Sequence, residues 1–151
     1  MNRDELLQAC FGENDLLEGE HILETLDEAR ENVLAHLAFS YRRIVVMPVT
    51  SSPGPGVTDA SKTLTVAAIM NVCTDPVHRR LGYASALVPS ALAMAAESPK
   101  IQFAALFGLE SFYGRFGFFH PAGAPHQHFL VAPVREGETW PDGRIKTFGE
   151  W

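Results

Sequence analysis

The sequence has few of the features that mark secreted, membrane-bound or disordered proteins. Its 151 residues include only two cysteines, Cys10 and Cys73, which are too few for the disulfide framework of a small secreted domain. No apolar run is long enough to cross a bilayer, and the first ten residues carry acids where a signal peptide has basic and then apolar residues. We therefore expect a cytoplasmic protein with reduced cysteines.

Positive charge is also scarce. The chain has 12 Lys and Arg residues against 18 Asp and Glu residues, which gives a net charge of −6 at pH 7. This charge repels nucleic acid and anionic membranes, so neither is expected as a partner, and it mildly favours an amine-bearing one. Repeats and low-complexity tracts are lacking as well, whereas hydrophobic residues make up 46% of the chain. Length and composition together predict a single globular domain over residues 1–151.

The chain is organised around an apolar, β-branched run from Leu64 to Val72. This run predicts a buried strand, and Pro76 follows it closely and removes a backbone donor. Apolar residues then recur with helical spacing, which predicts a helix from Arg80 to Glu97 with a kink at Pro89. The predicted unit is a strand, a tight loop and a helix.

The start of this helix is suited to bind phosphate. The first backbone N–H groups of a helix have no partner inside it, and the helix dipole favours an anion there. Gly82 and Ala84 keep side-chain bulk away from these groups, while Arg79 and Arg80 add positive charge. The alternative is an ordinary surface helix that begins with two arginines.

The rest of the chain predicts both helices and strands. Residues 15–32 are ambiguous, because their apolar spacing favours a helix whereas His21 to Leu26 and the polar run after it fit a strand entering a hairpin. Residues 51–62 are rich in Pro, Gly and Ser and predict a loop, either a flap near a site or an excursion without a role. Helices are expected at Arg3–Phe11 and Glu110–Phe116, and strands at Val33–Ser40, Ile44–Thr50, Gln102–Phe107, Gln127–Pro133, Arg144–Phe148 and from Phe118 onward.

Two motifs carry a resemblance to a known family. The spacing Arg79-x-x-Gly82-x-Ala84 is similar to the pyrophosphate-binding signature of the GNAT superfamily, the acetyl-CoA-dependent N-acetyltransferases. The segment L-E-S-F-Y-G-R-F-G-F, from Leu109 to Phe118, resembles the second signature of that superfamily, which packs beside the thioester end of acetyl-CoA. The two segments occur in the superfamily's order, and the resemblance covers about residues 35–119.

The resemblance implies an α+β fold with a central, mostly antiparallel mixed sheet that is splayed at its middle strands and flanked by helices. It favours the strand pair over the helix for residues 15–32. It further implies an N-acetyltransferase with acetyl-CoA as co-substrate and no metal, in which a primary amine of a small molecule or peptide attacks the thioester directly. The short N-terminal region leaves the floor of the acceptor pocket incomplete, and the partner subunit of a homodimer would complete it.

Tyr113 is the catalytic residue that the resemblance implies, because its counterpart in the superfamily commonly protonates the departing CoA thiolate. A phenol with a pKa of about 10 is protonated at neutral pH and can give this proton. The alternative is a core aromatic residue whose hydroxyl merely finds a partner. The residues expected to hold acetyl-CoA are Val72, Cys73, Thr74, Arg79, Arg80, Leu81, Gly82, Tyr83, Ala84, Ser111 and Phe112.

The general base has no clear candidate. Where some relatives place a glutamate on the organising strand, this chain has Met70, which cannot accept a proton. Water is one substitute, and Glu20, His21, His36 and the C-terminal carboxylate of Trp151 are others. The missing base leaves open a CoA-binding module without turnover.

Three histidines raise a third alternative, a metal-binding or partner-binding protein on the same fold. His126 and His128 would project to one side of a strand, but His120 lies across a turn rich in Pro, Ala and Gly. Their spacing matches no common zinc framework. Surface residues or walls of an acceptor pocket are the favoured interpretation.

Overall fold

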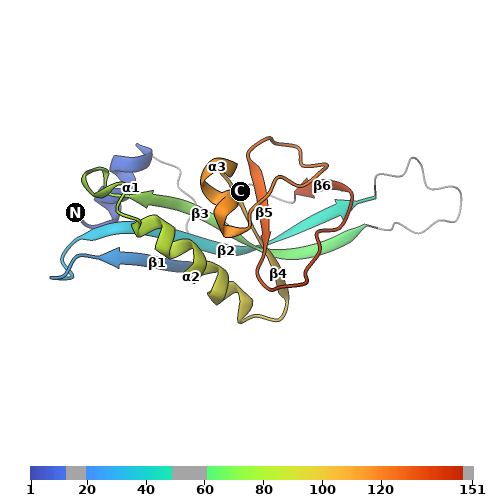
Figure 1. The fold of residues 1–151 in the computed structure, drawn as a ribbon, viewed down its shortest axis with the longest axis horizontal. Coiled ribbons are helices and arrows are strands. Elements are labelled where there is room, and N and C mark those ends of the chain that lie inside the picture. Colours follow the sequence, from blue (N-terminus) through green and yellow to red (C-terminus); the bar gives the residue numbers. More distant parts are fainter. Residues whose placement is uncertain (13–19, 49–60, 148–151) are drawn as a thin grey trace, which may run out of the picture.

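The computed structural model describes residues 1–12, 20–48 and 61–147. These residues form an α+β fold in which a six-stranded, mostly antiparallel sheet is flanked by helices (Figure 1). The sequence prediction of the fold class is confirmed. Among the helices of the described residues, none has both the length and the apolar character that a membrane span requires.

The strands lie along the sheet in the order β1, β2, β3, β4 and β5, and β6 pairs with β2. Only β3 and β4 are parallel, and the other neighbours are antiparallel. The elements, in chain order, are α1 (Arg3–Phe11), β1 (His21–Leu26), β2 (Val33–Met47), β3 (Lys62–Thr74), the 3-10 helix η1 (Pro76–His78), α2 (Tyr83–Ala96), β4 (Ile101–Phe107), α3 (Glu110–Tyr113), the 3-10 helix η2 (Gly114–Phe116), β5 (Phe129–Pro133) and β6 (Arg144–Thr147).

Strand β2 is one continuous strand, so the prediction of two strands separated by residues 41–43 was wrong. Tyr41 pairs with Ala67 and Arg43 pairs with Thr65, which keeps β2 and β3 side by side through the expected break. The segment has no Gly, Pro, Asn or Asp to form a turn, and the pairing therefore continues. Residues 49 and 50, the end of the second expected strand, lie outside the described residues.

Helix α2 begins at Tyr83, and the prediction of a start at Arg80 was wrong. Arg80 and Gly82 have φ angles of 68° and 84°, which lie in the left-handed region and cannot belong to a right-handed helix. The helix continues through Pro89 to Ala96. The kink at Pro89 stays a prediction.

Three other predictions concern residues 15–32, the loop at residues 51–62 and the strand from Phe118 onward. Strand β1 pairs antiparallel with β2, which agrees with the hairpin alternative, while residues 13–19 lie outside the described part of the chain. Of the expected loop, residues 51–62, residues 51–60 also lie outside it, and β3 begins at Lys62. Phe119 forms an isolated bridge with Val131 rather than a strand, because the chain turns at Pro121 and Gly123.

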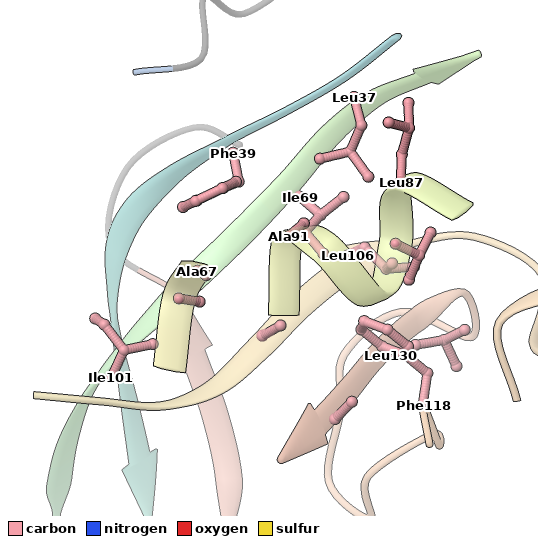
Figure 2. Close-up of a cluster of buried hydrophobic side chains, with 14 of the residues drawn as sticks. Leu37, Phe39, Ala67, Ile69, Leu87, Ala91, Ile101, Leu106, Phe118 and Leu130 are labelled. Atoms are coloured by element: carbon pink, nitrogen blue, oxygen red, sulfur yellow. The ribbon is translucent and has the colours of Figure 1, made fainter. Parts of the chain in front are cut away.

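The main core lies between α2 and one face of the sheet. Figure 2 shows Leu37, Ile69 and Leu87 pointing toward one another from β2, β3 and α2. Small residues such as Ala67 and Ala91 allow the helix to approach the sheet closely. A second cluster, which includes Val66, Phe103, Phe129 and the partly buried Trp140, covers the other face, and Leu6 of α1 packs with Val33 and Cys73 in a third.

Strands β3 and β4 separate from each other part-way along their length. Residues 65–68 of β3 pair with residues 101–105 of β4, but beyond Ala68 neither strand pairs with the other. A bulge lies nearby, because the register between β2 and β3 shifts after His36 and Asn71 on β3 has a φ angle of 55°. The sheet is therefore splayed at its middle strands, as the resemblance implies.

Candidate functional site

Two cavities of about 310 and 330 Å³ lie beside the part of β3 that β4 leaves unpaired. They share Thr74, Arg79, Ala84 and Phe112, and they therefore form one continuous groove. We call the first the thiol cavity; its other lining residues are Cys10, Phe11, Val72, Cys73 and Tyr113. We call the second the arginine cavity; its other lining residues are Arg80, Gly82, Tyr83, Ser85 and Arg115.

The loop between β3 and α2 is fixed by Asp75. Its carboxylate accepts a hydrogen bond from the N–H of Val77 at 3.1 Å and pairs with Nδ1 of His78 at 2.9 Å. Its own N–H donates to the carbonyl oxygen of Leu34 at 2.8 Å. The bond from His78, followed by that from Val77, lowers the pKa of the Asp75 carboxyl. A charged Asp75 therefore holds the start of the loop in place at neutral pH.

The start of α2 has free backbone donors. Gly82 is the N-cap residue, and no side chain caps the helix there. The first bond of the helix runs from the N–H of Ala86 to the carbonyl oxygen of Gly82 at 3.0 Å. Within the described residues, the N–H groups of Gly82, Tyr83, Ala84 and Ser85 have no protein acceptor. A Cβ atom on Gly82 would meet nothing within 4 Å, so an anion has open access to these donors.

Three arginines line the arginine cavity. Arg115 donates from Nη2 to the hydroxyl of Ser85 at 2.6 Å, and its guanidinium lies 4.7 Å from the ring centre of Phe112 and 4.9 Å from that of Phe116. Neither cavity has an Asp or Glu in its lining, and none of the three arginines has an ion pair among the described residues. In a protein of net charge −6, this unneutralised positive charge indicates a site for a polyanion.

Tyr113 lies at the other end of the groove, in the thiol cavity. Its ring packs edge-on against Phe112 at 4.8 Å and Phe118 at 5.8 Å. Burial raises the pKa of Tyr113 to about 12, so its hydroxyl stays protonated over the physiological range. The ring packs directly against the backbone of Gly108, where a Cβ atom would lie only 2.4 Å from Cε2 of Tyr113.

The two cysteines share the thiol cavity and are free. Cys10 on α1 is half-buried, and its Sγ donates to the carbonyl oxygen of Thr74 at 3.4 Å. Burial, with a smaller contribution from the neighbouring Cys10, raises the pKa of the Cys73 thiol to about 12. Cys73 is therefore an unreactive wall of the cavity rather than a nucleophile.

The structure gathers most of the residues expected to hold acetyl-CoA, together with Tyr113, along one groove. The exceptions are Leu81, which is 63% exposed, and Ser111, which is also exposed, since neither lines either cavity. Sequence reasoning missed Cys10, Phe11, Ser85 and Arg115. Arg115 stands inside the second signature and Ser85 in the first turn of α2, whereas the position of α1 left no signal in the sequence.

The candidates for a general base lie away from the groove. His21 stacks on Phe39 at 4.6 Å, and Glu20 is exposed. His36 is buried, and its Nδ1 donates to the carbonyl oxygen of Asn71 at 3.0 Å. None of these three side chains lines either cavity, nor does Met70. Trp151 lies outside the described residues.

The three histidines near β5 do not assemble with other ligands. The ring centres of His126 and His128 are 5.5 Å apart, and Nδ1 of His120 donates to the carbonyl oxygen of Phe129 at 3.1 Å. Over residues 1–12, 20–48 and 61–147, no group of three or more His, Cys, Asp or Glu side chains is placed to hold a metal ion. No observation on these residues supports the metal-binding alternative.

The groove has the parts expected of a CoA site, and a family model described as "Acetyltransferase (GNAT) domain" matches residues 5–120. The chain belongs to the GNAT acetyltransferase family. This family assignment covers the organising strand, the loop, α2 and the segment with Tyr113. No curated protein sequence matches the chain.

Several solved structures have a similar fold, two of them described as GNAT family proteins. A GNAT family N-acetyltransferase, YhbS from Escherichia coli in complex with CoA, has a TM-score of 0.57 and 21% identity over 94% of this chain and 73% of its own. Eis1 from Mycobacterium abscessus has a TM-score of 0.56 and 22% identity over 78% of this chain. A GNAT family acetyltransferase from Brucella melitensis in complex with acetyl-CoA has a TM-score of 0.50 and 20% identity over 78% of this chain. Our chain spans only 27% of the Eis1 chain and 60% of the Brucella chain.

Proposed function

We propose that this protein transfers an acetyl group from acetyl-CoA to a primary amine of a small molecule or peptide. The observation that carries the proposal is the groove itself, in which free helix N–H groups and arginines lie at one end and a protonated phenol at the other. The GNAT relatives solved with CoA and acetyl-CoA support the choice of co-substrate.

The residues of the groove fit acetyl-CoA, which supplies an acyl group activated as a thioester. The N–H groups of residues 82–85, with Arg79 and Arg80, would hold the diphosphate at the start of α2. Strand β4 does not pair with β3 at Val72 and Thr74, which line the thiol cavity. The backbone groups of β3 on that side would bind the pantetheine arm. This assignment directs the thioester toward the thiol cavity.

Tyr113 would act as the general acid. It lines the thiol cavity and would give its phenolic proton to the CoA sulfur as the C–S bond breaks and the acceptor nitrogen forms its bond to the acyl carbon. The phenolate then regains a proton from water, and the proton released by the amine leaves to water as well, so the protons balance. Because burial holds the pKa of Tyr113 near 12, the acid form is present throughout the physiological pH range.

One observation favours a second function, a CoA-binding module without turnover. The described lining of the groove contains no Asp, Glu or His, so no side chain there can accept the proton of a charged amine. An acetyltransferase with this lining depends on water, on amines that are already neutral, or on a residue outside the described part of the chain such as Trp151.

Calorimetry and mass spectrometry test both functions. We expect binding of acetyl-CoA by titration calorimetry, and a mass increase of one acetyl group on members of a library of small amines and peptides. Absence of binding at millimolar acetyl-CoA would exclude both functions. Binding without acetylation of any amine, and without release of CoA, would select the module over the enzyme.

Three further expectations remain part of the proposal. We propose a single domain over residues 1–151, a cytoplasmic location, and a homodimer that completes the acceptor pocket. Light scattering of the purified chain tests the homodimer, because a monomeric mass at micromolar concentration contradicts it. Fractionation of cells that express the chain tests the location.

A further inference from the structure

The arginine cavity holds more positive charge than a diphosphate requires. Each phosphate group of a diphosphate diester carries a single negative charge, and Arg79 and Arg80 together with the N–H groups of α2 match these two charges. Arg115 adds a further guanidinium from η2, a different element of the fold. Among the described residues no Asp or Glu lines the cavity, so a ligand with a further anionic group matches its charge better than a diphosphate alone.

Arg115 is held ready for such a group. The rings of Phe112 and Phe116 lie within 5 Å of its guanidinium, and Ser85 accepts a hydrogen bond from Nη2. A guanidinium carries five N–H donors, so most of them remain free to bind an oxyanion. The hydroxyl of Ser85 accepts from Arg115 and keeps its own proton to donate to the same anion.

The position of Arg115 along the groove shows which part of CoA it would meet. Tyr113 lines the thiol cavity only, Arg79 lines both cavities, and Arg115 lines the arginine cavity only. Along a CoA molecule the thioester comes first, the diphosphate follows, and the 3′-phosphate of the ribose comes last. Arg115 therefore lies on the side of the groove away from the thioester, with the residues assigned to the diphosphate, and the 3′-phosphate is the remaining anionic group of CoA on that side.

We propose that Arg115, with Ser85, binds the 3′-phosphate of CoA and makes the site selective for CoA over 3′-dephospho-CoA. This inference rests on the proposed function, since it assumes that the groove holds CoA. A phosphate monoester carries about −1.5 to −2 charges at neutral pH and three acceptor oxygens. A planar guanidinium suits it better than any other side chain.

Titration calorimetry with CoA and 3′-dephospho-CoA tests the inference. We expect the wild-type protein to bind CoA about tenfold more tightly, which corresponds to about 1.4 kcal/mol. Arg115→Gln should lower the affinity for CoA by about the same factor and leave that for 3′-dephospho-CoA unchanged. Arg43→Gln is the matched control, because it removes the same charge from an exposed position of β2 that lines neither cavity, and it should preserve the preference.

The outcomes of this experiment distinguish a failure of the inference about Arg115 from a failure of the proposed function. Equal weakening of both ligands by Arg115→Gln would mean that Arg115 binds the shared diphosphate, and the inference would be wrong. Equal affinities of the wild-type protein for both ligands would also overturn it, while the proposed function would stand. Binding of neither ligand by the wild-type protein would overturn the proposed function itself. Thermal unfolding of Arg115→Gln checks its fold, and Arg115→Lys, with the same two ligands, replaces it if the fold is lost.

Discussion

The two halves of β3 differ in what lies beside them. Val66, Ala67 and Ala68 are at most 1% exposed and pair with strands on both sides, β2 and β4. Beyond the bulge at Asn71, Thr74 pairs only toward β2, and Val72 and Thr74 both line the groove. One half of the strand therefore contributes pairing and burial to the core, and the other leaves an edge to which an extended ligand can bind.

This difference predicts that substitutions around one half of β3 change the stability of the fold, whereas substitutions around the other half change ligand binding. In the paired half, Val66, Ala67 and Ala68 are enclosed, so truncation of a buried side chain in this region leaves a cavity and costs folding free energy. In the unpaired half, Val72 and Thr74 border the thiol cavity, so we expect changes there to act on a bound ligand. The predictions below test this separation and are given in order of decreasing effect.

Truncation of Phe103 should have the largest effect on stability. Phe103 pairs with Val66 in register, is 1% exposed, and contacts Trp140 edge-on at 4.9 Å. Phe103→Ala should lower the free energy of unfolding by about 3–5 kcal/mol, measured by urea denaturation. Phe107→Ala, in the same strand beyond the paired half and 46% exposed, should cost about 1 kcal/mol. Equal losses would contradict the difference between the halves.

Removal of the Tyr113 hydroxyl should have the largest effect on turnover. Tyr113→Phe keeps the ring in its packing but removes the proton donor, so kcat should fall about 100-fold while the affinity for acetyl-CoA stays within about twofold. Steady-state kinetics and calorimetry measure the two quantities. Tyr41→Phe is the control, because Tyr41 packs beside Phe39 away from the groove and its loss should leave kcat unchanged. An unchanged kcat in Tyr113→Phe would remove the general acid from the proposal.

The raised pKa of Tyr113 predicts a specific dependence on pH. With a pKa of about 12 in the folded state and about 10 in the unfolded state, the folded protein binds more protons between these values. The contribution of the Tyr113 phenol to the free energy of unfolding is therefore complete below pH 10 and is lost as the pH rises through 12. Denaturation series at alkaline pH should show a steeper loss of stability for the wild-type protein than for Tyr113→Phe. Equal slopes would mean that the phenol is not buried.

Gly108 should matter because it leaves room for the Tyr113 ring. Gly108→Ala would place a Cβ atom 2.4 Å from that ring and force it to move. We expect kcat to fall about tenfold, and no further fall when Gly108→Ala is combined with Tyr113→Phe. Gly114→Ala is the control, since its Cβ atom would meet only Cγ of Glu110, at 3.8 Å. Additive losses in the double variant would mean that Gly108 acts elsewhere.

Gly82 should affect binding more than stability. Gly82→Ala puts a side chain at the free N–H groups of α2 and strains a φ angle of 84°, so the affinity for CoA should fall about fivefold in calorimetry. Gly117→Ala is the matched control, because Gly117 has a φ angle of 93°, open space around it and no place in either cavity. Both variants should lose about 1 kcal/mol of stability. Equal affinities would show that the diphosphate does not lie at Gly82.

The sequence predicted most of the fold because its signals are local. The apolar run of β3, the turn at Pro76 and the spacing of α2 all depend on neighbouring residues, and each element appears in the structure. The errors concern element boundaries. Residues 41–43 carry polar side chains that suggested a break, and only the pairing of β2 with β3 shows that they continue the strand.

The sequence by itself determined the uncapped, positively charged start of α2, because its N–H groups and Arg79 and Arg80 belong to one contiguous loop and helix start. Only the tertiary structure decided the rest. The wall formed by Cys10 and Phe11 and the contact of Arg115 with Ser85 join residues that are far apart in the chain. Packing between elements brings such residues together, and no local pattern records it, because the same amphipathic helix or short turn can pack in many ways.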